Sequence, residues 1–236
     1  MANGEKKTSP WVWVGVGCLG VTVVGIAVIA GISYWGYRTV RRMADDLKDP
    51  VSRERRVKEV LGADMLPPGY HPVVAISVPF IMEMAILSDR EPDEGGQTRG
   101  FEERGFIYVK MLGVEKQQRE LQEFFEGKRD DAEILRQHSI RMRQGDVVAR
   151  GGIEGDDLQV MYVAHRGGID VQNAEVDGVT SLLLVQCRED KRTRLGIWFA
   201  PDPDPSKAPA EADFTGSPGD EKAIRTFIEH FDFCHP

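Results

Sequence analysis

Residues 11–36 read WVWVGVGCLGVTVVGIAVIAGISYWG, and none of them carries a charge. A helix of this length extends ~39 Å at a rise of about 1.5 Å per residue, whereas the hydrocarbon core of a bilayer is roughly 30 Å thick. Aromatic side chains stand at both ends, Trp11 and Trp13 at the start and Tyr34 and Trp35 at the finish. This placement is typical of a helix that meets two membrane–water interfaces. The stretch therefore predicts a single transmembrane helix, with the lipid bilayer as the chain's first partner.

Two other interpretations of an apolar N-terminal segment fit this one less well. A secretory signal peptide has a shorter apolar region followed by a small-residue cleavage site, which this sequence lacks. A lipoprotein would be modified at Cys18, but Gly15 stands three residues upstream where a leucine is usual, and the apolar run continues past the cysteine.

Glycine recurs through the apolar stretch. Residues 15–20 match the G-x-G-x-x-G pattern of dinucleotide-binding proteins, but that pattern needs a preceding strand and an acidic residue about twenty positions later, where Val40 stands. Small residues also allow two membrane helices to approach closely. We therefore assign helix packing, against another membrane protein or a second copy of the chain, to Gly20, Gly25, Ala27 and Gly31.

The side of the membrane on which the bulk of the chain lies is not fixed by charge. Lys6 and Lys7 precede the apolar stretch, whereas Arg38, Arg41, Arg42 and Lys48 follow it. Because Lys and Arg accumulate on the cytoplasmic side, this count leans toward a cytoplasmic domain. A short tail with its own lysine pair is compatible with the opposite orientation, so the side is left open.

The whole chain of 236 residues has the composition of an ordinary soluble protein, with 41% hydrophobic and 29% charged residues and a net charge of −8. This acidity argues against a nucleic-acid partner, because binding to phosphates requires basic charge. We expect a polar tail (1–10), the transmembrane helix (11–36), a charged helical stalk (37–62) and an α+β globular domain (63–236).

The stalk should contain a helix that restarts after Asp49-Pro50. Ser52 is the expected N-cap, Gly62 the expected C-cap, and the expected apolar face consists of Val57, Val60 and Leu61. Acidic residues interrupt the basic ones, which favours a spacer that docks on the domain over a basic patch that binds anionic lipid.

The domain sequence predicts a mostly antiparallel sheet covered by helices. Residues 73–91 are apolar with Pro79 inside, which predicts two strand pieces or one strand with a bulge. Further strands are expected at 105–113, 140–143, 147–153, 158–165, 180–187 and 194–200. One helix is expected at 115–128, with inward-facing Leu121, Phe124 and Phe125. An amphipathic helix should run from Asp220 to Phe233 and cover the sheet with Ile224, Phe227, Ile228 and Phe231. Residues 201–219 should form an extended, mobile, Pro-rich loop.

The least ordinary polar residues of the domain are His165, Arg166 and Asp170, expected at a strand end. Arg150-Gly151-Gly152-Ile153-Glu154 recurs as Arg166-Gly167-Gly168-Ile169-Asp170. Paired Gly-rich loops of this kind can hold an anion through backbone N–H groups and arginine. Two strand ends that need glycine for a bulge or a tight bend give the same pattern, and we favour that structural interpretation while keeping His165, Arg166, Asp170 and Arg150 as binding candidates.

The sequence carries no recognised catalytic signature, and we predict neither a cofactor nor a metal. His230, Cys234 and His235 are close enough in sequence for a soft metal, but no second cluster completes a set of four ligands. Cys187 and Cys234 would pair if the domain faces an oxidising compartment and would remain thiols inside the cell.

Three functions remain open, and the first is favoured. The protein is a single-pass membrane-anchored protein whose α+β domain is a binding or interaction module, or an enzyme with an unfamiliar site that acts on a membrane-adjacent substrate, or a subunit that assembles through its Gly-rich helix.

Overall fold

The computed structural model describes residues 49–78, 80–93, 100–113, 115–128, 140–171 and 174–235, without the side chains of 140–144 and 169–176. The predicted tail, transmembrane helix and first part of the stalk lie outside these residues. Within the described part, no helix is both long and apolar enough to cross a membrane.

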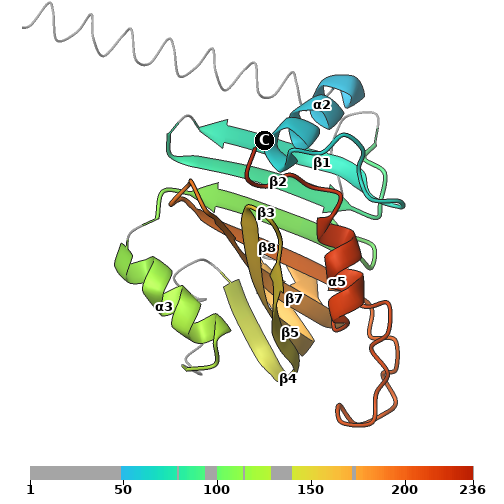
Figure 1. The fold of residues 1–236 in the computed structure, drawn as a ribbon. Helices are drawn as coiled ribbons and strands as arrows, with labels where there is room; N and C mark the ends of the chain where they lie inside the picture. Colours follow the sequence, from blue (N-terminus) through green and yellow to red (C-terminus); the bar gives the residue numbers. More distant parts are fainter. Residues whose placement is uncertain are drawn as a thin grey trace, which may run out of the picture. The chain divides into compact units, whose positions relative to one another are not determined.

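The domain is built on one antiparallel sheet, shown in Figure 1. Its strands run in the order β1-β2-β3-β8-β7-β5-β4, and the short β6 pairs with β5 outside this path. The bounds are β1 His71–Val78, β2 Met82–Ser88, β3 Gly105–Met111, β4 Ile140–Glu154, β5 Leu158–Val171, β6 Ala174–Val176, β7 Val179–Cys187 and β8 Thr193–Ala200. The described helices are α2 Pro50–Leu61, α3 Glu115–Phe125 and α5 Glu221–Ile228. The predicted α+β class is thus confirmed.

Alternating side chains of the strands build a separate core on each face of the sheet. The first core joins α2 and α5 to residues such as Phe106, Leu183 and Trp198. The second core joins the predicted Leu121, Phe124 and Phe125 of α3 to residues such as Ile107, Val163 and Leu182. β7 and β8 are buried along nearly their whole length because both faces are covered there.

Helix α2 begins at Pro50, and its N-cap is Asp49 rather than the predicted Ser52. The Asp49 carboxylate accepts a hydrogen bond from the Ser52 backbone N–H (3.1 Å). Proline suits the first helical position because its missing N–H would have no helical partner there. The predicted apolar face is confirmed, since Val57, Val60 and Leu61 are buried, and so is the C-cap at Gly62, which has a φ of 63°.

We expect Gly62→Ala to destabilise the domain by about 2 kcal/mol or more, because the left-handed backbone alone costs roughly 1–2 kcal/mol for a side chain. A Cβ at this position would also collide with the carbonyl of Asp232. The two residues are close because the Asp232 N–H donates to the Gly62 carbonyl (3.0 Å). Gly216 has a similar φ of 77° with open space around it. Urea unfolding of Gly216→Ala is the matched control, and equal losses in both variants would show that the approach of Asp232 is unimportant.

Several strand and helix bounds differ from those predicted. The strands expected at 140–143 and 147–153 form one long strand, β4, whose pairing with β5 has register shifts at Met142/Gly145 and Val147/Ala149. His165 and Arg166 therefore lie inside β5 and not at a strand end. Helix α5 stops at Ile228, five residues before the predicted end at Phe233, because the chain turns there to bring Cys234 to Cys187; Phe231 and Phe233 still reach the core.

Candidate functional site

The structure separates the four polar residues that the sequence grouped together. His165 and Arg166 are neighbours inside β5, so their side chains point to opposite faces of the sheet. Arg150 of β4 pairs with Val163 and shares the face of His165. Asp170 pairs along the backbone with Arg141 and Glu175, and its side chain lies outside the description. The four residues do not form one cluster among the described side chains.

His165 is buried without a hydrogen bond. Its side chain is 5% exposed, and neither ring nitrogen has a partner among the described residues. Thr180 lies directly opposite on β7, and its hydroxyl is also buried without a partner. Burial, assisted by the nearby charge of Arg150, lowers the pKa of His165 to about 4. A neutral imidazole enclosed in this way is a core residue rather than a proton-transfer group, which must reach its substrate.

Arg166 fixes the Pro-rich loop to the sheet. Its guanidinium pairs with the carboxylate of Asp202 and donates to the backbone carbonyls of Asp204 (2.8 Å) and Lys207 (2.6 Å). The hydroxyl of Ser181 bonds to the carbonyl of Pro218 at the other end of the loop. Residues 201–219 contain no helix or strand, as predicted, but they form a series of hydrogen-bonded turns instead of an extended segment, and Arg166 holds them to the sheet.

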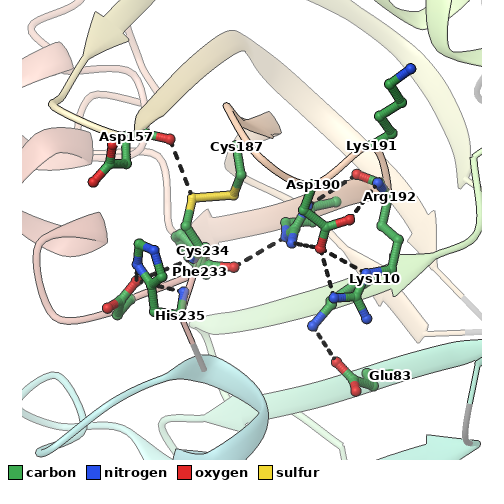
Figure 2. Close-up of polar contacts among 12 residues, drawn as sticks. Glu83, Lys110, Asp157, Cys187, Asp190, Lys191, Arg192, Phe233, Cys234 and His235 are labelled. Carbon is green, nitrogen blue, oxygen red and sulfur yellow. Dashed lines mark hydrogen bonds and ion pairs between the residues drawn. A yellow bond between two sulfur atoms is a disulfide. The ribbon is translucent and has the colours of Figure 1, made fainter.

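A polar hollow of about 420 Å³ lies beneath α2 and beside the C-terminal segment. Its lining comes from α2, β1, β2, β3, the residue before β8 and the C-terminal segment. The lining residues are Arg56, Glu59, Val60, Ala75, Ser77, Glu83, Lys110, Arg192, Cys234 and His235. Lys110, only 4% exposed, forms an ion pair with Glu83 (2.7 Å). Figure 2 shows this pair next to the larger network around Asp190.

The network around Asp190 ties two arginines to the end of the chain. Arg194 is fully buried; it pairs with Asp190 and donates to the carbonyl of Phe233 (3.1 Å). Arg192 bonds to the same carboxylate (2.7 Å). Burial alone would raise the pKa of Asp190, but hydrogen bonds from Arg192 and Arg194 hold it well below its usual value. The network therefore joins the start of β8 to the C-terminal segment, and the Asp190 carboxylate is occupied by its two arginine partners.

A disulfide between Cys187 and Cys234 closes the same region, as Figure 2 shows. It joins the end of β7 to the segment after α5. Asp232 accepts hydrogen bonds from the N–H groups of Cys234 (3.2 Å) and His235 (2.9 Å). Since Cys234 is oxidised, it is not available as the soft metal ligand considered from the sequence. Among the residues that the structure describes, no group of three or more His, Cys, Asp or Glu is arranged to hold a metal ion.

A second hollow, also of about 420 Å³, is mostly apolar and lies along α5. Its floor is aromatic: the Trp198 ring stacks on Phe227 with centroids 4.4 Å apart, and Tyr70 meets Phe227 edge-on at 5.4 Å. The indole N–H of Trp198 donates to the Tyr70 hydroxyl (2.7 Å). Pro67 and Pro68 form one wall, and the rim carries Thr226 and His230 among other residues.

The two polar groups of the aromatic floor, the Trp198 indole N–H and the Tyr70 hydroxyl, are bonded to each other. Burial raises the pKa of Tyr70, although the bond from Trp198 opposes the shift, so the phenol stays neutral and hydrogen-bonded. The Arg104 guanidinium lies over the Tyr70 ring, 5.7 Å from its centroid. What the hollow offers to a ligand is therefore apolar aromatic surface with a polar rim, the usual make-up of a small-molecule or side-chain pocket.

No protein-family model matches the chain, and no match was found among curated proteins or solved structures.

The aromatic hollow was not found from the sequence, although two signals were present. Pro67-Pro68-Gly69-Tyr70 is a turn cluster that ends in an aromatic residue, and Trp198 interrupts the aliphatic run of β8. Nothing in the sequence brings Tyr70 to Trp198, which lies 128 positions later. The sheet order β1-β2-β3-β8 brings Tyr70, which directly precedes β1, to the same face as Trp198 of β8.

Proposed function

We propose that this protein is a single-pass membrane-anchored binding module whose aromatic hollow receives an apolar group of its ligand. The observation that carries the proposal is the aromatic floor of the hollow, where half-buried Tyr70 meets the nearly buried rings of Trp198 and Phe227 and accepts a hydrogen bond from the Trp198 indole. A ligand that covers this floor removes apolar surface from water and keeps the bond between Trp198 and Tyr70.

The anchor is the charge-free stretch 11–36. Ultracentrifugation of lysed cells tests it: we expect the full chain in the membrane pellet after a high-salt or alkaline wash and in the supernatant only after detergent is added. Recovery of the intact chain in the detergent-free supernatant would remove the membrane part of the proposal.

The disulfide supports placing the domain on the oxidising, non-cytoplasmic side of the membrane. Cys187–Cys234 pairing is expected where thiols are not kept reduced. The Lys and Arg count around residues 11–36 leans the other way, but only by a few residues. Protease added to intact cells or spheroplasts should therefore degrade the domain; protection until lysis would indicate the cytoplasmic side.

Ligand binding is tested by filling the hollow. The probe ligand is indole, and its binding to the full chain in nanodiscs is measured by saturation-transfer NMR. Thr226 lies exposed on the rim of the hollow, so the larger side chain of Thr226→Trp should fill the hollow and abolish the indole signal. Arg225→Trp is the matched control, since Arg225 is exposed on the same helix but does not line the hollow. No indole signal in the parent chain, or equal signals in both variants, would contradict this assignment.

A further inference from the structure

An exposed apolar patch consists of Phe80 and Ile81, in the turn between β1 and β2, and Leu112, directly after β3. Their exposed fractions are 92%, 62% and 64%. The Ile81 N–H donates to the Val78 carbonyl (3.0 Å) to close the turn, and the Leu112 N–H donates to the Ile81 carbonyl (3.4 Å). The three side chains therefore belong to one backbone-linked tip, which we call the hairpin tip.

Phe80 is an unfavourable residue for its position in two respects. It has a φ of 65°, a left-handed conformation in which glycine or asparagine is usual and a bulky side chain is strained. Its ring is also almost fully exposed to water and contributes nothing to either core. Neither the turn nor the packing of the domain explains a phenylalanine here, so its explanation lies in something outside the domain.

Charge does not direct the hairpin tip to its partner. Residues 49–236 contain 24 Lys and Arg against 35 Asp and Glu, so the domain is repelled by an anionic surface. Close to the tip, Lys110 is paired with Glu83. The contact made by the tip must therefore rest on its apolar side chains.

We propose that the hairpin tip inserts into the headgroup–acyl boundary of the bilayer in which the chain is anchored, an inference that rests on the proposed membrane anchor. Residues 37–49 connect the anchor to α2 and span at most roughly 45 Å when extended, so the bilayer is within reach of the domain. Exposed Phe, Ile and Leu side chains are those that partition into this boundary.

A lipid surface suits the tip better than a second protein does. Three side chains at one turn offer far less than the ~800 Å² per partner of a standard protein interface. A tethered domain needs no such area, because the anchor holds the tip at high effective concentration beside the lipid. The result is a second point of contact that fixes the orientation of the domain on the membrane.

The test uses the full chain in phosphatidylcholine vesicles with nitroxide-bearing lipids as quenchers. A fluorophore is attached to Glu115→Cys in a Cys18→Ala chain, since Glu115 is exposed three positions after Leu112. We expect quenching several-fold stronger there than at the control position Glu211→Cys in the Pro-rich loop. Adding Phe80→Gly and Leu112→Ser should reduce quenching at position 115 to the control level. Glycine is chosen at residue 80 because it accepts the left-handed backbone there without strain.

The same vesicles separate failure of this inference from failure of the anchor. A fluorophore on Cys18 of the unmodified chain reports on the anchor itself. Quenching at Cys18, with equal quenching at positions 115 and 211, would overturn the lipid contact and leave the anchor in place. Absence of quenching at Cys18 would overturn the anchor. If the fluorophore at position 115 is shielded from water but not quenched by the lipids, and copies of the chain crosslink, the tip would be assigned to a second chain instead.

Discussion

Replacing both Cys187 and Cys234 by alanine should lower the free energy of unfolding by about 4 kcal/mol, the chain-entropy value for a closed loop of this size. The disulfide spans 47 positions and closes a loop that contains β8, the Pro-rich loop and α5. Without it, the last residues are held by the bond from Arg194 to the Phe233 carbonyl, by the contact of Asp232 with Gly62 and by the packing of Phe231 and Phe233 in the core. The C-terminal segment is therefore expected to detach first.

The measurement is urea unfolding of the full chain in detergent micelles, followed by near-ultraviolet circular dichroism with and without reductant. Reductant should lower the parent to the stability of the double variant and leave the variant itself unchanged. Cys18→Ala is the control and should respond like the parent. Thiol counting after denaturation gives a second readout: one reactive thiol in the oxidised chain and three in the reduced chain, from the three cysteines of the sequence. If reductant does not change the unfolding of the parent chain, the disulfide does not form.

Local patterns in the sequence were sufficient for most elements of the domain. The alternation in residues 158–164 predicted β5, the apolar run 182–185 predicted β7, and the spacing of Leu121, Phe124 and Phe125 predicted the buried face of α3. These are signals within one element, set by the periodicity of a strand or a helix. The N-cap of α2 was misplaced because Asp49 and Ser52 are both good caps, and only the geometry shows that Asp49 accepts from Ser52.

Long-range partners were not predictable in the same way. The sequence left the pairing of Cys187 with Cys234 open because it depends on the compartment that the domain faces; in the structure, the turn after Ile228 brings the two cysteines together. His165 and Arg166 looked like one site because they are adjacent, yet adjacency inside a strand separates two side chains to opposite faces. That prediction assumed a strand end, whereas β5 continues to Val171.

Lowering the pH from about 6.5 to about 4 should cost the domain about 3 kcal/mol through His165 alone. Its pKa is about 4 in the folded state against 6.5 for an ordinary histidine, and each pKa unit corresponds to about 1.4 kcal/mol. Within this window the unfolded chain binds a proton at residue 165 that the native state does not, so stability falls as the pH falls. Above this window, His165 is neutral in both the folded and the unfolded state and costs no stability. Below this window, His165 is protonated in both states, so lowering the pH further causes no more loss through this residue.

His165→Leu should remove this part of the pH dependence, because leucine fills the apolar site without a titrating group. Urea unfolding of the variant and the parent at several pH values between 4 and 7 measures it. Loss of stability below pH 4 has a different source in carboxylates such as Asp190, whose lowered pKa comes from its arginine partners. An unchanged slope in His165→Leu would show that the imidazole finds water or a partner in solution.

Thr180→Val distinguishes the titration of His165 from the general cost of an unpaired polar atom at this site. The Thr180 hydroxyl lies opposite His165 and is buried without a hydrogen bond among the described residues. Valine has nearly the same shape, so its substitution should raise the free energy of unfolding by about 1 kcal/mol at every pH. Because the hydroxyl does not titrate in this range, the slope between pH 4 and 6.5 should stay that of the parent. A change in slope would mean that Thr180 bonds to the imidazole and that the two residues act as a pair.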